Sequence, residues 1–598
     1  MQPRWDDLTA SKPLRLWPGV VLAVLLGIRY AVTLPMLYSV GGALAASLAI
    51  IAWWLFFSRA PWIERVGVIA LGAVALYATS FAVDLSISNG FQGLLLPIFA
   101  LPAMGLALVA ASVLGRTLAP GSRRALTAAA IVLACAVFTT MRTGGITGDA
   151  ESDFHWRWTP TPEDRLLVQE ATVEQAPAPP VVASGLPDGS ARDDSSRSPN
   201  PGLVPEPPAH PAEWPGFRGP ERDSILRGVR IDPDWSASPP AELWRRAVGP
   251  GWSSFAVDNG ILYTQEQRGE EEQVAAYSVT TGEPVWRHSD PVRFYESNGG
   301  AGPRGTPTVS NGRVYALGAT GILNALDAAT GAVIWSRNAA TDTGVPVPGW
   351  GISSSPVVFN DVVVTAVSGA LIAYDPATGT QRWLLKSRGG SYSSPQLVTI
   401  DGVPQLLFQS GFGATSVAPD SGMVLWEHAW EGFRIVQPAV VPGGSGVIVT
   451  DASAAGGLNL RRLDVARGPN GWTVEEKWTS PGLKPYFNDF VIHAGHAFGF
   501  DGSILSSIDI ADGTRKWKGG RYGHGQLMLL PEQDLLLVLS EEGELALVGA
   551  TPGGHVEHAR FKAIDGKTWN HPALVNNVLV VRNGEEMAAF RLAPARGE

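Results

Sequence analysis

Eight polar residues recur between residues 254 and 571 at intervals of roughly 40 to 50 residues. They are Ser254, Thr306, Ser355, Ser394, Gln437, Asp489, His524 and His571. Asp489 and His524 are the candidate catalytic residues, because a carboxylate and an imidazole can work as an acid and base pair. A second interpretation is that all eight side chains only satisfy backbone groups and waters inside a narrow channel.

An aromatic-rich set lies two positions before the polar residues: Trp252, Arg304, Ser353, Tyr392, Ile435, Phe487, Tyr522 and Trp569. Asn488 and Asn570 fall between the two sets, and Arg434 and Arg521 add positive charge nearby. A polar ring beneath an aromatic rim favours a flat anionic ligand or a peptide loop. The ligand-binding candidates are therefore Trp252, Arg304, Tyr392, Arg434, Asn488, Asp489, Tyr522, His524, Trp569, Asn570 and His571.

The elements that position these residues belong to a repeat. The pattern Asp-x-x-Thr-Gly-x-x-x-Trp occurs at Asp327 to Trp335 and Asp375 to Trp383, with a variant at Asp509 to Trp517. One copy reads as strands 313–317, 322–327 and 332–335 separated by Asn-Gly and Thr-Gly turns. Four short antiparallel strands per repeat are typical of a propeller blade.

The eight polar residues mark eight blade starts, with the innermost strands lining a central channel. The eighth blade, 571–592, has about three strands, and the isolated segment 242–248 has no blade of its own. We predict that this early strand completes the last blade, since an open ring would expose an unpaired edge. The conserved place of Trp286, Trp335, Trp383, Trp426, Trp478 and Trp517 within each repeat predicts packing between neighbouring blades.

Five apolar runs near the N-terminus, 14–34, 37–57, 66–83, 91–114 and 125–141, are each close to the ~20 residues of a transmembrane helix. Arginines and a lysine lie before the first run and in the second and fourth loops, whereas the other loops have none. The positive-inside rule then predicts a cytoplasmic N-terminus and an extracytoplasmic C-terminal part. The fold expected is an all-β eight-bladed propeller preceded by an α-helical membrane domain of five helices.

The predicted domains are a cytoplasmic tail (1–13), the membrane helices (14–141), a juxtamembrane segment with a disordered linker (142–213) and the propeller (214–598). The linker is expected because residues 174–211 are rich in Pro, Ser and Asp and hold few bulky apolar side chains. This arrangement predicts a bacterial inner-membrane protein whose propeller lies in the periplasm.

Composition excludes several other classes. The formal net charge is −10 and no block of Lys or Arg lies on the repeats, which argues against a nucleic-acid partner. The single cysteine, Cys135, allows no intrachain disulfide and no cysteine zinc cluster. Asn488 and Asp489 are the only metal alternative on the ring, and a hard divalent ion usually requires more oxygen ligands.

The Asp-x-x-Thr-Gly-x-x-x-Trp repeats resemble the pyrroloquinoline-quinone-like (PQQ-like) propeller repeats of quinoprotein dehydrogenases and of BamB-like outer-membrane assembly lipoproteins, over about 214–592. The resemblance implies one of two functions. The first is a binding or scaffold module for a periplasmic protein or small ligand at the channel mouth. The second is a PQQ-dependent dehydrogenase, holding PQQ with calcium, that oxidises an alcohol or sugar and passes electrons to membrane quinone. The scarcity of carboxylates on the ring and the missing cysteine pair favour the first.

Overall fold

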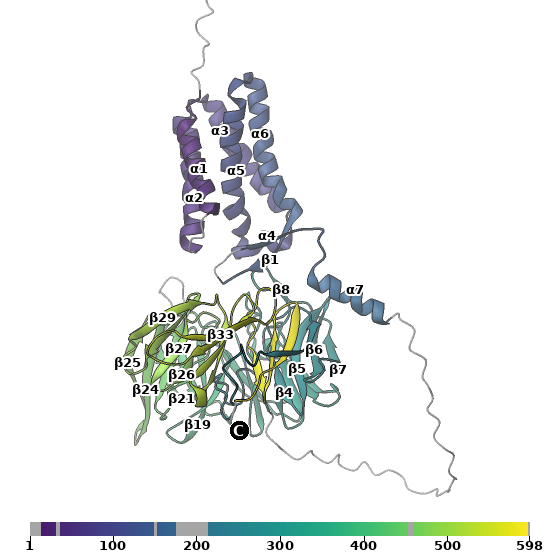
Figure 1. Ribbon diagram of the computed structural model, residues 1–598, viewed down its shortest axis with the longest axis vertical. Helices are drawn as coiled ribbons and strands as arrows, with labels where there is room; N and C mark the ends of the chain where they lie inside the picture. Colours follow the sequence, from purple (N-terminus) through teal and green to yellow (C-terminus); the bar gives the residue numbers. More distant parts are fainter. Residues whose placement is uncertain (1–13, 32–35, 149–151, 175–212, 453–458, 596–598) are drawn as a thin grey trace, which may run out of the picture. The chain divides into compact units, whose positions relative to one another are not determined.

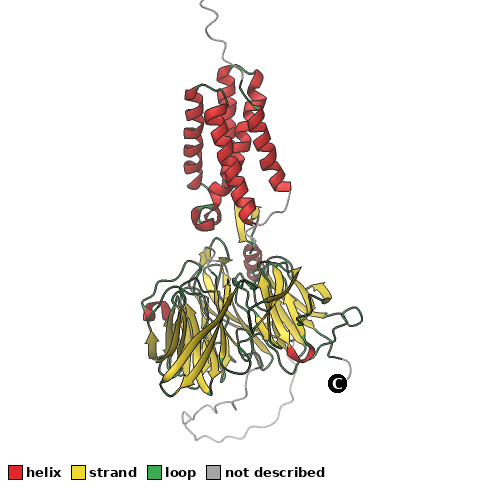
Figure 2. Ribbon diagram, turned by 90° about the vertical axis from the view of Figure 1, so that its left-hand side faces the viewer, coloured by secondary structure: helices red, strands yellow, loops and turns green. Residues whose placement is uncertain are grey.

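The computed structural model describes residues 14–31, 36–148, 152–174, 213–452 and 459–595. The chain forms two compact units, one of residues 1–159 with 295–301 and one of residues 160–294 with 302–598. Figure 2 shows that the first unit is mainly helical and that the second is built mainly of strands. The predicted cytoplasmic tail and most of the predicted linker, 175–212, lie outside the described residues.

Apolar helices make up most of the first unit (Figure 1). They are α1 (Trp17–Ala31), α2 (Met36–Ala52), α3 (Trp62–Ser80), α5 (Leu95–Leu114) and α6 (Pro120–Ala136), with a short α4 (Leu85–Ser88) and a π-helical turn at Trp53–Phe57. Within the described residues, four segments have the length and hydropathy of a membrane span: Val40–Phe57, Trp62–Ser80, Leu95–Thr117 and Pro120–Thr140. The first of the five expected spans contains α1, which is a shorter apolar helix.

Two small hairpins complete this unit. Strand β1 (Met141–Ile146) pairs with β2 (Ser152–Trp156), and β8 (Tyr295–Glu296) pairs with β9 (Gly300–Ala301). The turn between β8 and β9 is bonded to its neighbours in the unit, because Ser297 Oγ donates to the Leu85 carbonyl at 3.2 Å. The backbone N–H of Ile146 likewise donates to the Asn298 carbonyl at 3.1 Å. Residues 295–301 are therefore part of the helical unit although they lie far along the sequence.

The second unit contains eight four-stranded antiparallel sheets within the described residues. Blades 1 and 2 are β4 (Ala256–Asp258), β5 (Ile261–Arg268), β6 (Glu271–Ser278), β7 (Pro284–Asp290), and β10 (Thr308–Ser310), β11 (Arg313–Leu317), β12 (Ile322–Asp327), β13 (Val333–Asn338). Blades 3 and 4 are β14 (Val357–Phe359), β15 (Val362–Val367), β16 (Ala370–Tyr374), β17 (Gln381–Leu385), and β18 (Gln396–Ile400), β19 (Val403–Ser410), β20 (Gly413–Val417), β21 (Val424–Ala429).

Blades 5 and 6 are β22 (Ala439–Val440), β23 (Gly446–Asp451), β24 (Asn459–Gly468), β25 (Gly471–Ser480), and β26 (Val491–His493), β27 (His496–Asp501), β28 (Ile504–Asp509), β29 (Arg515–Arg521). Blades 7 and 8 are β30 (Gln526–Leu530), β31 (Leu535–Leu539), β32 (Glu544–Gly549), β33 (Glu557–Lys562), and β34 (Ala573–Val575), β35 (Val578–Arg582), β36 (Glu586–Arg591), β3 (Ala241–Ala247). Each of the eight predicted blade starts lies two residues before the innermost strand of its blade, so the predicted eight-bladed propeller is confirmed.

The ring closes as predicted. Strand β3, from the start of the propeller sequence, pairs antiparallel with β36 from its end, and Trp244 lies opposite Ala589. The eighth sheet therefore combines the two ends of the repeat region in the order β3-β36-β35-β34. This pairing removes the free edge that three strands alone would leave.

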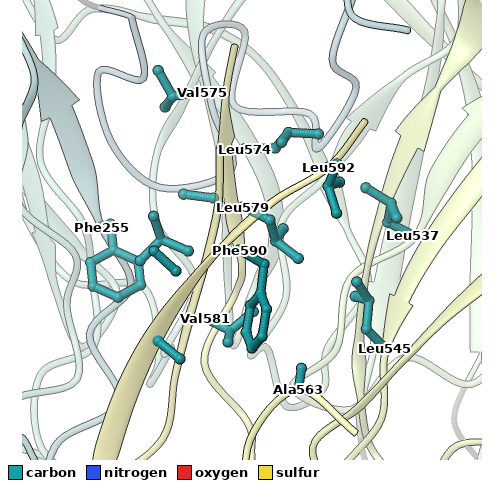
Figure 3. Packing of buried hydrophobic residues seen from close by; sticks show 14 of the residues in the cluster. Phe255, Leu537, Leu545, Ala563, Leu574, Val575, Leu579, Val581, Phe590 and Leu592 are labelled. Carbon is teal, nitrogen blue, oxygen red and sulfur yellow. The ribbon is translucent and has the colours of Figure 1, made fainter. Parts of the chain in front are cut away.

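Both faces of each sheet are buried, because every blade lies between two neighbours. In β31, alternate residues Leu535, Leu537 and Leu539 join the cluster with blade 8, whereas Leu536 and Val538 join the cluster with blade 6. Figure 3 shows the first of these clusters, where Phe590 and Leu579 of blade 8 lie beside Leu537 and Leu545 of blade 7. Burial on both faces explains why these strands read as continuous apolar runs instead of alternating ones.

The repeated motif forms a Trp–Gly contact between neighbouring blades. Asp327 Oδ1 accepts from Thr330 N at 2.9 Å and from Thr330 Oγ1 at 2.8 Å, which bends the chain into a tight turn. Gly331 follows at φ 73°, and a Cβ there would come within 2.5 Å of the Trp286 ring of the preceding blade. Trp286 Nε1 then donates to the Ala328 carbonyl at 3.0 Å. The indole of one blade thus packs against a glycine in the turn of the next blade, where a larger residue would not fit.

The same contact recurs around the ring. The pairs are Trp244 with Gly282, Trp335 with Gly379, Trp383 with Gly422 and Trp478 with Gly513. Trp517 Nε1 donates to the Thr551 carbonyl of the next blade at 2.7 Å. Trp426 differs in its polar contact, since its Nε1 donates to Gln405 of its own blade at 2.7 Å, but its ring packs with Val447 of blade 5. Packing of these tryptophans between blades is confirmed.

Part of the predicted juxtamembrane segment is an ordered helix, α7 (Pro162–Glu174), which belongs to the propeller unit. Leu166 is buried, Glu163 lies 2.7 Å from Arg293, and Glu170 lies 2.6 Å from both Arg268 and Arg287. The helix is therefore held to blade 1 and the segment that follows it by several ion pairs. A short helix, α8 (Ala339–Thr343), follows β13.

The Trp–Gly contact is testable by adding one methyl group. We expect Gly379→Ala to lower the free energy of unfolding by about 3 kcal/mol or more, because strain at positive φ adds to overlap with the Trp335 ring. Gly402→Ala is the matched control: its φ is 72°, yet an added Cβ meets nothing within 4 Å. It should cost only about 1 kcal/mol. Thermal unfolding of the full-length protein in detergent measures the stability of both variants. Equal losses of stability would contradict a stabilising Trp–Gly contact.

Candidate functional site

Aromatic side chains from the segments that precede the innermost strands touch one another in a chain. Trp252 lies 4.8 Å from Trp569, which lies 4.7 Å from Phe487 between ring centroids. Tyr486 is next to Phe487 at 5.5 Å, and Trp350 links Tyr486 at 6.5 Å to Tyr392 at 5.1 Å. Phe433 contacts both Trp350 and Tyr392 at 5.6 Å. We call this set the aromatic rim: Trp252, Trp350, Tyr392, Phe433, Tyr486, Phe487 and Trp569.

Every member of the aromatic rim is partly exposed. Lys567 Nζ lies 4.5 Å from the centre of the Trp569 ring and 5.3 Å from that of Trp252. Arg304 Nε donates to the Trp350 carbonyl at 3.3 Å, and its guanidinium lies over Phe294 at 5.2 Å. The rim therefore offers aromatic faces beside two cations, which suits apolar, aromatic or anionic groups.

The sequence comparison found Trp252, Tyr392, Phe487 and Trp569 but missed Trp350, Phe433 and Tyr486. The aromatic set was defined as the residues two positions before each blade start. Trp350, Phe433 and Tyr486 lie three to five positions before their blade starts. Their aromatic identity close before a blade start was the available signal.

Two predicted candidates do not present their side chains at the rim. Tyr522 is buried, its hydroxyl donates to Glu557 Oε2 at 2.6 Å, and it lies 2.9 Å from His555 Nε2. Burial and then the hydrogen bond to Glu557 raise the pKa of Tyr522. Arg434 is buried with one amino group 3.0 Å from Asp451 Oδ1, and burial lowers its pKa to about 10 although Asp451 opposes the change. The structure does not bring Tyr522 to the rim, and Arg434 is engaged in an internal ion pair.

The polar ring is a hydrogen-bonded relay between blades. The backbone N–H of Ser254 donates to Thr306 Oγ1 at 2.9 Å, and that of Thr306 donates to Ser355 Oγ at 2.9 Å. The relay continues from Ser355 to Ser394, from Ser394 to Gln437 and from Gln437 to Asp489 Oδ1, at 2.9, 2.7 and 3.0 Å. Ser254 Oγ donates to the His571 carbonyl at 2.5 Å. Six of the eight side chains, those of Ser254, Thr306, Ser355, Ser394, Gln437 and Asp489, thus bond backbone groups of adjacent blades, as the second interpretation stated for the whole ring.

Residues 214–224 lie against this ring. Arg218 is buried, donates to Ser224 Oγ at 2.8 Å and to the Phe490 carbonyl at 3.0 Å, and lies 3.5 Å from Asp489 Oδ1. Arg222 donates to the carbonyls of Pro356 and Ser355 at 2.9 and 3.1 Å. This segment of turns thus contacts blades 3 and 6 with two buried arginines. The sequence shows the motif Trp214-Pro-Gly-Phe-Arg-Gly-Pro, but it does not show that this segment packs against the polar ring.

These contacts set the charge states of the ring. Burial raises the pKa of Asp489, whereas Arg218 and the Gln437 N–H oppose that rise. Burial, reinforced by Arg218, lowers the pKa of His571 to about 3, so this imidazole is neutral at physiological pH. His571 Nε2 lies 3.2 Å from Ser224 Oγ and its ring packs edge-on against Phe217.

Among the described residues, Asp489 and His524 do not contact each other. The carboxylate beside His524 is Glu541, whose Oε2 accepts from the His524 backbone N–H at 3.0 Å and lies 3.7 Å from Nδ1. Glu541 Oε1 also accepts from Trp569 Nε1 at 2.8 Å. The imidazole of His524 lies 5.6 Å from Phe487, at the edge of the aromatic rim. The acid nearest to His524 is therefore one that the repeat alignment did not select.

Several buried polar atoms near the rim have no hydrogen-bond partner among the described residues: Asn488 Nδ2, Asn570 Oδ1, His524 Nδ1 and Gln526 Oε1. Gln526 Nε2 donates to the Trp569 carbonyl at 3.0 Å, which places this amide next to the rim. Asn570 Nδ2 donates to the Ser253 carbonyl at 2.7 Å. Such atoms normally bind water or a ligand, so both donors and acceptors are available close to the aromatic faces.

The comparisons with known proteins agree with the repeat pattern. A family model described as outer membrane protein assembly factor BamB matches residues 236–405. BamB of Shewanella oneidensis is 25% identical over 375 residues, covering 57% of this chain and 86% of the relative. The dehydrogenase subunit of a quinone alcohol dehydrogenase from Gluconobacter oxydans is 25% identical over 210 residues, covering 33% of this chain and 26% of that protein. The crystal structure of BamB from Moraxella catarrhalis aligns with a TM-score of 0.45 at 15% identity, over 59% of this chain and all of that one. The propeller is a PQQ-like repeat module with similarity to BamB and to quinoprotein dehydrogenases.

The residues do not fit a PQQ cofactor held by a divalent ion. Of the predicted metal alternative, Asp489 has the Arg218 guanidinium 3.5 Å away, and Asn488 Oδ1 already accepts from Tyr486 N at 3.2 Å. Within the part of the chain that the structure describes, there is no group of three or more acidic, histidine or cysteine side chains that could hold a metal. A hard metal ion bound at Asp489 would thus be repelled by the Arg218 guanidinium and would have too few oxygen ligands.

The pKa of His571 gives a pH dependence. The pKa of this histidine is about 6.5 in the unfolded chain and about 3 in the native state. Below pH 6.5 the unfolded chain therefore binds a proton that the native state does not bind. The contribution of His571 to the free energy of unfolding is fully present above pH 6.5 and is lost as the pH falls toward 3. We expect the wild type to lose about 1.4 kcal/mol through this group between pH 7.5 and 5.5. His571→Gln, whose amide can still contact Ser224, should lose that slope. Thermal unfolding of both proteins across this pH range measures it, and parallel curves would contradict a neutral buried imidazole.

Proposed function

We propose that this protein is a membrane-anchored binding module whose aromatic rim receives an apolar or aromatic peptide segment of a protein partner. The observation that supports it is a continuous set of partly exposed aromatic rings above a ring of polar groups that already bond one another. Aromatic side chains supply most of the binding free energy at protein interfaces.

The similarity to BamB supports a protein partner over a small substrate. That relative is named as an assembly factor for outer membrane proteins, and the match extends over 86% of its length. Assembly factors act by contacting other proteins. The apolar helices of this chain would hold such a propeller at a membrane.

Photo-crosslinking tests the rim directly. A photoreactive amino acid in place of Trp350 should give a discrete protein adduct in intact cells, because this ring is partly exposed at the centre of the rim. The same group in place of Met423, which is 62% exposed on an outer turn, is the control and should give none. Trp569→Ala should weaken the Trp350 adduct roughly tenfold or more, as loss of a central aromatic does at interfaces. An identical adduct from both positions, or none from Trp350, would refute the assignment.

The quinoprotein dehydrogenase is the second candidate, supported by the partial match to the Gluconobacter oxydans subunit. Titration of the full-length protein with PQQ and calcium separates the two functions. We expect no change in melting temperature, because Arg218 neutralises Asp489 and metal ligands are scarce. Saturable binding that raises the melting temperature would favour the dehydrogenase, since a ligand specific for the folded state stabilises it by mass action.

We further propose five spans, with α1 as the first, a cytoplasmic N-terminus and an extracytoplasmic propeller in a bacterial inner membrane. The charges support it: Arg59, Arg65, Arg116, Arg123 and Arg124 lie in alternate loops, and the remaining loops carry none. A reporter enzyme that works only outside the cytoplasm should be active when fused after Gly145. A silent reporter there, with an active one after Arg116, would invert the topology.

A further inference from the structure

The helical unit contains a pocket of about 270 Å³ that the propeller function does not use. It lies between α3, α5, α6 and the π-helical turn after α2, and its lining includes Trp54, Glu64, Gly67, Ser112, Arg123 and Arg124. Pockets that enclose a whole drug-sized ligand are usually about 300–1,000 Å³, so this one suits the head and first atoms of a larger molecule. A π-helical turn in a wall is itself common at functional sites.

The pocket carries more positive than negative charge. Glu64 Oε2 lies 3.3 Å from Arg123 and Glu64 Oε1 lies 2.8 Å from Arg124, and the Glu64 side chain is only 9% exposed. Two guanidinium groups therefore share one carboxylate. Each guanidinium has five N–H donors, so donors remain for a further anion.

A buried donor points to the same chemistry. Trp54 is 3% exposed, and its Nε1 has no hydrogen-bond partner among the described residues. Its neighbour Trp53, by contrast, donates to the Arg15 carbonyl at 2.9 Å. An unpaired buried N–H costs free energy, which an acceptor bound in the pocket would recover.

The remaining wall is apolar and open. Gly67, Val68 and Leu71 of α3 face Ala128 of α6 across the pocket, and a Cβ built on Gly67 meets nothing within 4 Å. Gly67 is exposed, as is Ile63 one turn earlier. In a bilayer this open wall would adjoin acyl chains, whereas the arginines lie at the helix ends.

We propose that this pocket binds the phosphate of an anionic glycerophospholipid, with Arg123, Arg124 and Trp54 Nε1 as donors and the start of an acyl chain along Gly67 and Leu71. Basic pockets between transmembrane helices on the cytoplasmic side are suited to such headgroups. A neutral ligand with carbonyl acceptors would pair Trp54 but leave the excess positive charge uncompensated.

Native mass spectrometry of the full-length protein in neutral detergent tests the site, with phosphatidylglycerol and phosphatidylcholine of the same chains added in turn. We expect retention of phosphatidylglycerol to exceed that of phosphatidylcholine by roughly fivefold. Gly67→Leu, which fills the pocket without changing charge, should abolish this preference. Gly42→Leu in α2, also an exposed helix glycine with nothing within 4 Å, is the matched control and should keep it.

Glu64→Gln gives a test of opposite sign, because it releases both arginines to the phosphate. It should raise the phosphatidylglycerol preference by a further factor of roughly five. Melting temperatures of all variants report whether the bundle remains folded, and a variant that melts early is replaced by Gly67→Ala, which fills less of the pocket. Equal retention of the two lipids by the wild type, or a preference unchanged by both Gly67 substitutions, would overturn the proposal. So would retention of an added isoprenoid quinone in place of phosphatidylglycerol.

Discussion

The propeller depends on one repeated contact, in which an indole from the outermost strand of a blade lies on a glycine of the next blade's turn. Gly331 and Gly379 have positive φ and leave no room for a Cβ beneath Trp286 and Trp335. In these two turns the first residue, Asp327 or Asp375, holds the turn by accepting from the following Thr. The glycine turn of one blade is thereby coupled to the tryptophan of the preceding blade, so each blade helps to orient its neighbour. This coupling keeps the innermost strands in register.

Because the blades are fixed in this way, the residues before each innermost strand meet at a common point. Nearest the strands, hydroxyl, amide and carboxylate groups bond the backbone of adjacent blades, and Arg218 completes the set from outside the repeats. These groups are therefore committed to structure. The aromatic rings a few residues earlier are partly exposed and touch one another. The binding proposed for this protein is therefore placed at the rim and not at the ring beneath it.

The helical unit uses its charges differently. Glu64 is paired with two arginines on another helix, and the imbalance is concentrated at one pocket. In the propeller, the buried Glu266 accepts from Arg268 and from Tyr277, and the buried Arg582 donates to Thr264 Oγ1 and to the carbonyls of Gln265 and Gly249. A buried charge left without a partner would cost several kcal/mol, so these contacts stabilise the fold.

Local chemistry allowed the sequence by itself to determine the number of blades, their starting residues and the closing strand. Glycine turns, apolar runs and a terminal tryptophan are each set within a few residues, so their repetition predicted β11 and β12 to the residue and the start of β13 to within one residue. The site was predicted only in part, because side-chain direction depends on contacts between distant segments. Tyr522 shares its offset with Trp252 and Trp569, yet Glu557 and His555 hold its hydroxyl away from the rim. Likewise Asp489 is engaged by Arg218, 271 residues earlier in the chain, and only the tertiary structure decided that pairing.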